Sequence, residues 1–211
     1  MKVVPVKLFV PHIAPMLEKC PDFVIEREVV KTVASACRES GCITTTVEFK
    51  SEKGKEDYEF LMPEGLDADV VRFVYCDGLQ LKPLTYNGLT GRLPVDWREG
   101  EGKPVAYSFR QHGEMTLFPT PDAEYTVRVD VTATVRTDTA VVPEFFFSSH
   151  LDLVAYGVLS RVHRIVGQPY SSMELAEGYE AKYNAELARL KGEAFRDFTR
   201  TAGRVRFNRI I

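Results

Sequence analysis

Residues 148–169 read SSHLDLVAYGVLSRVHRIVGQP, and this stretch decides where the chain forms its helices. Its apolar residues recur at the i, i+3, i+4, i+7 spacing that places them on one face of an α-helix. They are Leu151, Val154, Ala155, Val158, Leu159, Val162, Ile165 and Val166. Ser149-His-Leu-Asp152 is typical of a capping box, so we expect the helix to begin at Ser148 or Ser149. Gly167, followed by Pro169, predicts where it ends.

A second helix is predicted directly after this one. Ser171-Ser-Met-Glu174 is another capping box. The apolar residues that follow it share roughly one side of a helix: Leu175, Tyr179, Tyr183, Leu187, Leu190 and Ala194. Two amphipathic helices joined by so short a turn are expected to pack antiparallel as an αα-hairpin.

An earlier helix is predicted between Val24 and Glu39. The residues of its apolar face are Ile25, Val29, Val33 and Ala36 or Cys37. Asp22 is the predicted N-cap and Gly41 the predicted stop.

After Gly41 the hydrophobic period changes from 3.6 residues to two, which predicts strands. Alternating or β-branched runs cover residues 43–49, 70–76, 105–109 and 125–135. In the last run the intervening residues are predicted to face solvent: Thr126, Arg128, Asp130, Thr132, Thr134 and Arg136. Turn signals such as Asp77-Gly78 and Asn87-Gly88 separate the runs. This spacing favours an antiparallel sandwich or barrel-like sheet.

The predicted fold class is therefore α+β. A helical bundle, made of the N-terminal helix and the C-terminal αα-hairpin, carries an inserted antiparallel β domain and an extended C-terminal tail. The predicted boundaries are residues 1–41 for the N-terminal segment and helix, 42–142 for the β domain, 143–197 for the C-terminal helices and 198–211 for the tail.

The composition excludes several classes of protein. The chain has 211 residues, 45% of them hydrophobic and 27% charged, with a formal net charge of -3, so it does not read as a dedicated nucleic-acid or membrane protein. No apolar run approaches the roughly 20 residues that span a bilayer. The first residues are too short an apolar stretch for a signal peptide, and we expect synthesis in the cytoplasm.

The sequence predicts neither an active site nor a bound metal or cofactor. The cysteines lack CxxC spacing and histidine neighbours, and are expected to be small buried side chains: Cys20, Cys37, Cys42 and Cys76. The histidines are scattered: His12, His112, His150 and His163. Ser148, Ser149 and His150 are adjacent at a predicted helix start, so they cannot pair as nucleophile and base. We expect a protein without enzymatic activity.

The C-terminal tail is predicted to bind a partner. No acidic residue follows Asp197, and from Arg204 onward basic and apolar residues alternate as they do in an extended strand. The tail either folds back on its own domain or adds a strand to a partner or fills a groove in it. We favour the partner. The residues expected to contact it are Arg200, Arg204, Val205, Arg206, Phe207, Arg209, Ile210 and Ile211.

Several short motifs, in order, resemble tailed-phage adaptor proteins, also called head-to-tail connectors, of the tail tubular protein A type. They cover most of the chain from Pro11 to Phe195. They are Ala14-Pro-Met-Leu-Glu-Lys-Cys-Pro21, Ala34-Ser-Ala-Cys37-Arg, Tyr75-Cys-Asp77-Gly78-Leu-Gln-Leu-Lys-Pro83, Met115-Thr-Leu-Phe-Pro119-Thr-Pro121, Val142-Pro143, Ala155-Tyr-Gly157-Val-Leu, Gly167-Gln-Pro169-Tyr-Ser171 and Gly178-Tyr179-Glu-Ala-Lys-Tyr183.

The resemblance implies a virion structural protein at the head-to-tail interface. It implies a dodecameric ring of this chain that binds beneath the portal protein, meets a downstream tail or nozzle protein, and lets double-stranded DNA pass without specific binding. It also implies that the C-terminal tail reaches the portal. One alternative is a carbohydrate- or receptor-binding β module on a helical support, although such modules usually expose tryptophan and tyrosine platforms and this chain has a single tryptophan, Trp97. Another is an enzyme whose site is assembled from distant residues.

Overall fold

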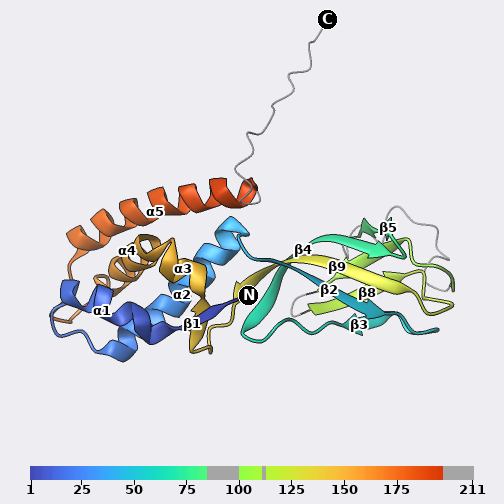
Figure 1. The fold of residues 1–211 in the computed structure, drawn as a ribbon, viewed down its shortest axis with the longest axis horizontal. Coiled ribbons are helices and arrows are strands. Elements are labelled where there is room, and N and C mark those ends of the chain that lie inside the picture. The colour runs from blue at the N-terminus through green and yellow to red at the C-terminus, as the bar shows by residue number, and fades with distance from the viewer. Residues whose placement is uncertain (85–99, 111–112, 197–211) are drawn as a thin grey trace, which may run out of the picture. The chain divides into compact units, whose positions relative to one another are not determined.

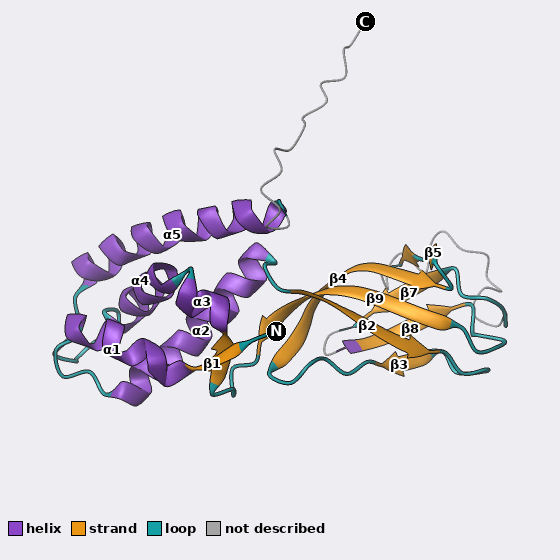
Figure 2. Ribbon diagram, viewed as in Figure 1, coloured by secondary structure: helices purple, strands orange, loops and turns teal. Residues whose placement is uncertain are grey.

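The computed structural model describes residues 1–84, 100–110 and 113–196. It divides into two compact units, one formed by residues 1–42 together with the chain from Thr137 onward, and one formed by Ile43–Arg136. We call them the helical unit and the β unit and describe each by itself (Figure 1). Helices dominate the first and strands the second, so the α+β class is confirmed (Figure 2).

The helical unit begins with short elements and continues with three longer helices. In chain order these are β1 Val3–Pro5, η1 Val6–Phe9, α1 Val10–Ile13, η2 Ala14–Met16, α2 Asp22–Ser40, β10 Val141–Pro143, α3 Glu144–Ser148, α4 Leu151–Val162 and α5 Met173–Phe195. α4 packs against both α2 and α5. Burial of the apolar faces of these helices, at roughly 1.5–3 kcal/mol for each large side chain, is the main source of their stability.

Helix α2 follows the predicted pattern closely. Ile25, Val29, Val33 and Cys37 are all fully buried on one face. Gly41 ends the helix in the left-handed conformation, at φ 61°, and donates its N–H to the Cys37 carbonyl at 2.8 Å. Asp22, by contrast, is the first helical residue and not the cap, because the chain enters the helix through Pro21.

The predicted start of α4 is wrong by two or three residues. A short helix, α3, comes first, and Ser149 caps its C-terminal end by donating its N–H to the Phe145 carbonyl at 2.9 Å. Ser149 therefore cannot open the next helix, which begins at Leu151 after His150 and has no side-chain cap.

The predicted end of α4 is also wrong. The helix stops at Val162, because the His163 ring and carbonyl both bond to the returning chain: Nδ1 lies 2.6 Å from the Tyr170 carbonyl, and the His163 carbonyl accepts from the Ser172 N–H at 2.9 Å. Val166, expected on the buried face, is 85% exposed. Gly167 lies in the turn that follows, with φ of 80°.

The N-cap of helix α5 lies one residue later than the predicted cap, Ser171. Ser172 is the N-cap, and its hydroxyl accepts from the Leu175 N–H at 3.4 Å. Leu175 is exposed and Tyr179 is half-buried, so Ala176 takes the first core position instead. The remaining predicted positions are buried: Tyr183, Leu187, Leu190 and Ala194.

The β unit is two four-stranded sheets. One has the order β2-β9-β4-β5 and the other β3-β8-β7-β6. The strands are β2 Thr44–Lys50, β3 Asp57–Glu59, β4 Leu66–Cys76, β5 Leu79–Gln80, β6 Lys82–Pro83, β7 Ala106–Phe109, β8 Glu114–Phe118 and β9 Thr126–Val135. The pairs are antiparallel as predicted, except that β6 and β7 pair in parallel. Asn87-Gly88, a predicted turn, lies outside the described residues.

The two sheets enclose one hydrophobic core. Its members come from both sheets: Tyr58, Phe60, Val74, Cys76, Leu81, Tyr107, Met115, Leu117, Val127, Val129 and Val131. Strand β9 shows the predicted alternation at its start, but Thr132 and Thr134 are buried where solvent exposure was predicted. Thr132 is covered because β4 bulges beside it, and its hydroxyl bonds to both the N–H and the carbonyl of Val70 at 3.2 Å.

Residues 137–142, which the sequence analysis assigned to the β domain, belong to the helical unit. Here β10 pairs antiparallel with β1, joining Val4 to Val142, and Val6 donates its N–H to the Ala140 carbonyl at 3.0 Å. The N-terminal segment supplies β1, the partner of β10. A local sequence pattern does not predict pairing between segments so far apart in the chain.

Candidate functional site

The residues predicted to bind a partner all lie outside the described residues: Arg200, Arg204, Val205, Arg206, Phe207, Arg209, Ile210 and Ile211. The last described helix, α5, ends at Phe195. A functional reading of the structure must therefore begin with the surfaces of the two units.

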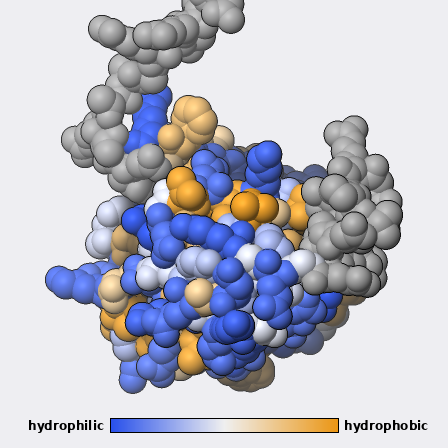
Figure 3. All heavy atoms as spheres, turned by 90° about the vertical axis from the view of Figure 1, so that its right-hand side faces the viewer, coloured by the Kyte–Doolittle hydropathy of each residue, from blue (hydrophilic) through white to orange (hydrophobic). Residues whose placement is uncertain are grey.

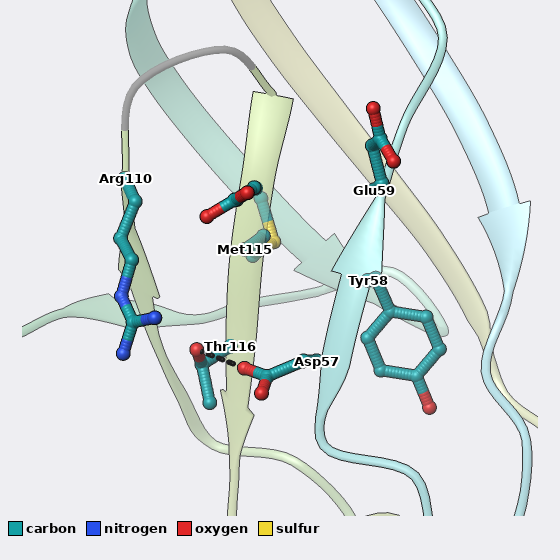
Figure 4. Close-up of a pocket in the computed structure, with 7 residues that line it drawn as sticks. Asp57, Tyr58, Glu59, Arg110, Met115 and Thr116 are labelled. Carbon is teal, nitrogen blue, oxygen red and sulfur yellow. Dashed lines mark hydrogen bonds between the residues drawn. The ribbon is translucent and has the colours of Figure 1, made fainter.

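A hollow with an acidic lining lies on the β unit, where β3 and β8 pair (Figure 4). Its volume is about 360 Å³, and its lining includes Asp57, Glu59, Glu114 and Arg110. The register of β3 and β8 sets Glu59 directly opposite Glu114. Asp57 lies beside them and accepts a hydrogen bond from the Thr116 hydroxyl at 2.5 Å.

This hollow favours a positively charged ligand or side chain. Carboxylates opposite each other across paired strands repel, and a cation between them removes the repulsion. Arg110 lines the same hollow and supplies one such charge. The sequence does not predict this site, because only the pairing of β3 with β8 brings residues 57–59 and 114 together.

A second hollow, of about 410 Å³, lies on the solvent face of the other sheet and is largely neutralised by its own side chains. Arg128 lies over the Tyr75 ring at 5.9 Å and its Nε is 3.3 Å from the Asp130 carboxylate. The Thr126 N–H, at 3.0 Å, and the Lys103 ammonium, at 3.1 Å, lower the pKa of Asp77. Internal pairing neutralises Asp77 and Arg128, so Glu48 is the lining side chain whose charge is left for a ligand.

The helical unit carries a third and more apolar hollow of about 540 Å³. Phe23, 68% exposed, stands at its wall, with Val6, Val30 and Val141 around it. Glu26 and Arg27 also line it. Such a hollow suits an apolar side chain.

Three aromatic residues of the helical unit form a stacked row. His163, Tyr179 and Tyr156 stack in sequence, with ring centroids 5.7 Å and 6.1 Å apart. The Lys182 ammonium lies over both tyrosine rings, at 5.5 Å from Tyr156 and 5.3 Å from Tyr179. A lysine on the ring faces does not leave the open platform that a sugar stacks on.

The catalytic candidates weighed from the sequence are not brought together. The Ser148 and Ser149 hydroxyls lie 3.4 Å from each other, while His150 Nε2 faces the Glu193 carboxylate at 3.5 Å. Across the described parts of the chain, no three His, Cys, Asp or Glu side chains gather as metal ligands would. In the same residues, no helix combines the length and the apolarity needed to cross a bilayer.

One face of the molecule is largely polar. Figure 3 shows a face on which hydrophilic residues predominate and hydrophobic ones are scattered among them. Single exposed apolar side chains are ordinary on protein surfaces and mark no interface by themselves. Contacts with partners are then expected to use charge and backbone groups as much as apolar area.

The chain matches a family of known proteins. The curated proteins contain no match to the chain. The family of the SU10 adaptor protein matches residues 18–206, nearly the whole of the described chain, and it is a family of phage head-to-tail adaptors. Proteins of this kind are virion components that contact other parts of the head or tail. The chain therefore belongs to the SU10 adaptor protein family.

Proposed function

We propose that this adaptor protein forms a dodecameric ring that joins the portal to the tail and extends the channel through which DNA leaves the head. The match of residues 18–206 to the adaptor family carries the proposal. The closer likeness to the tail tubular protein A type, and the description of the helices as a bundle that supports the ring, belong to the same proposal. The ring meets a downstream tail or nozzle protein at its other side.

The proposed work is structural and not enzymatic. A ring repeats identical weak contacts, so avidity holds a joint that one copy could not hold alone. The formal net charge of -3 suits a conduit, because a basic lining would bind phosphates and slow the passage of DNA.

The C-terminal segment is the proposed contact with the portal. Ordering about a dozen residues costs on the order of 1–2 kcal/mol each in backbone entropy. An exposed ion pair contributes under about 1 kcal/mol, so the arginines alone cannot offset that cost. The apolar residues Val205, Phe207, Ile210 and Ile211 must be buried in the assembled particle, at roughly 1.5–3 kcal/mol for each fully buried side chain.

Ending the chain after Asp197 tests this contact. We expect the shortened protein to keep its melting temperature, because no described core residue is removed, and to lose binding to the portal. Light scattering of the portal with and without the adaptor measures the binding. Unchanged affinity would place the portal contact elsewhere, and a fall in melting temperature would show that the segment folds back on its own domain.

A further inference from the structure

Strand β2 is an edge strand whose outer side is open. Among the described strands, β9 is its single pairing partner. Ile43 accepts from the Ala133 N–H at 2.9 Å and Ser51 donates to the Tyr125 carbonyl at 2.8 Å, so the odd-numbered residues bond to β9. Backbone groups alternate in direction along a strand. The even-numbered residues of β2 therefore direct their N–H and carbonyl groups outward: Thr44, Thr46, Glu48 and Lys50. In the described ranges no backbone group bonds to them there.

The opposite edge of the same sheet is built differently. There β4 has bulges between Ala68 and Val70 and between Val71 and Phe73. Its last residues are covered by β5, and the Val74 carbonyl accepts from the Leu81 N–H at 2.8 Å. Bulges, prolines and covering strands are the usual protection of sheet edges against pairing. β2 has an unbroken register over its whole length and no proline, so it is the pairing-competent edge of this sheet.

The side chains of β2 define what can pair with it. On the core side Val47 and Phe49 are only half-buried, and the Phe49 ring stacks on Tyr58 of β3 at 5.1 Å. A strand placed beside β2 would complete their burial with apolar side chains. On the solvent side Glu48 is exposed and, within the described residues, makes no ion pair. β3, on the same flank, adds the exposed Glu59. The fitting strand alternates apolar with basic residues.

The sequence outside the described residues contains such an alternation. Residues 204–208 read Arg-Val-Arg-Phe-Asn, with Val205 and Phe207 on one side of an extended chain and Arg204 and Arg206 on the other. We propose that residues 204–208 of a second copy pair with the outer edge of β2. Val205 and Phe207 then lie toward Val47 and Phe49, and the arginines toward Glu48.

The pairing rests on the proposed ring and deepens it. One copy contributes residues 204–208 and the next contributes the edge of β2, so the two contacting surfaces differ and the contact is head-to-tail. Repeated around an axis, such a contact closes a ring of identical subunits. Within the ring it narrows the portal contact of the C-terminal segment to the residues outside the paired stretch. These are Arg200, Arg209, Ile210 and Ile211.

A peptide of residues 202–209, added to the chain ended after Asp197, tests the pairing without the portal. At ten times the dissociation constant, we expect amide exchange at Thr44, Thr46, Glu48 and Lys50 to slow about tenfold. Amides already bonded to β9, such as that of Val47, should be unaffected. A scrambled peptide of the same composition is the control. No slowing, or equal slowing by the scrambled peptide, would overturn the proposal.

Two further measurements separate the alternatives. Glu48→Lys should weaken binding of the peptide about fivefold by removing one exposed ion pair. Glu177→Lys, at an exposed position of α5, should leave peptide binding unchanged.

Light scattering of the full chain should show a mass that rises with protein concentration. The mass of the shortened chain should stay constant. The amides of β2 could be protected from exchange in a full chain whose mass does not change with concentration. Residues 204–208 would then pair with β2 of the same copy, and the proposed contact between copies would be overturned. Portal binding is measured separately. If the adaptor does not bind the portal, the peptide and light-scattering measurements still test the pairing with β2.

Discussion

Gly157 of α4 lies close to side chains of both α2 and α5. A Cβ atom added there would lie 2.3 Å from Thr32 Cγ2 of α2 and 2.9 Å from Tyr183 Cδ2 of α5. Glycine in the middle of a helix normally costs about 0.5–1 kcal/mol relative to alanine. Here the missing side chain is what lets α4 approach both neighbours, so the loss in helix propensity is offset by packing.

Replacement of Gly157 by alanine should therefore destabilise the helical unit. We expect a loss of about 1–3 kcal/mol in the free energy of unfolding, the usual range for overpacking. Urea denaturation followed by circular dichroism measures it. Gly178→Ala is the matched control, because nothing lies within 4 Å of its added Cβ, and it should stabilise α5 by about 0.5–1 kcal/mol. Equal effects of the two substitutions would refute the close approach.

His150 makes the stability of the helical unit depend on pH. Burial lowers the pKa of His150 below its usual 6.5 and outweighs the opposing effect of the Glu193 carboxylate. The folded chain holds the imidazole neutral, whereas the unfolded chain binds a proton as the pH falls through 6.5. The contribution is thus present above pH 6.5 and is lost toward the lower folded-state pKa.

His150→Phe should flatten that dependence. The aromatic ring can keep the edge contacts that His150 makes with Phe145 and Phe146 at 5.8 Å and 6.4 Å. Denaturation midpoints measured between about pH 7.5 and about pH 5 should fall less steeply in the variant than in the natural chain. Parallel curves would mean that another group titrates.

At the scale of elements, periodicity predicted the strands and helices, and contacts across the chain decided their ends. The apolar faces of α2 and β9 follow from spacing alone, because each turns one side to a core. Ser149 fits the rule for an N-cap of α4, but in the structure it is the C-cap of α3. The open edge of β2 and the acidic hollow of β3 and β8 depend on which strands pair, and the sequence contains no local record of that.

The Asp77-Gly78 turn between β4 and β5 is one element that the sequence did predict. Both residues have positive φ, 47° and 80°, as a two-residue hairpin turn of the right twist requires. Gly78→Ala should cost about 1–2 kcal/mol, because an L-residue is strained in that region. Nothing lies within 4 Å of the added Cβ, so a measured loss in urea denaturation would report backbone strain alone. Unchanged stability would show that the turn adapts.

At the scale of the whole molecule, assembly is expected to depend on the partner. The part of the chain that the structure describes has no long heptad repeat, and its exposed apolar side chains are scattered. We expect the purified protein to be monomeric or weakly associated and to form rings when portal is added. Light scattering before and after the addition decides this. A tight dimer that portal leaves unchanged would contradict the ring.

The pairing of the first and last strands of the β unit has a consequence for engineering. Ile43 enters the unit and its carbonyl bonds to Ala133, three residues before the chain leaves at Arg136. Entry and exit are neighbours, so the unit is one continuous cassette attached at a single place. Residues 43–136 could be cut out as a separate polypeptide, or replaced by a short turn from residue 42 to residue 137, and a β cassette from another adaptor could be grafted in its place.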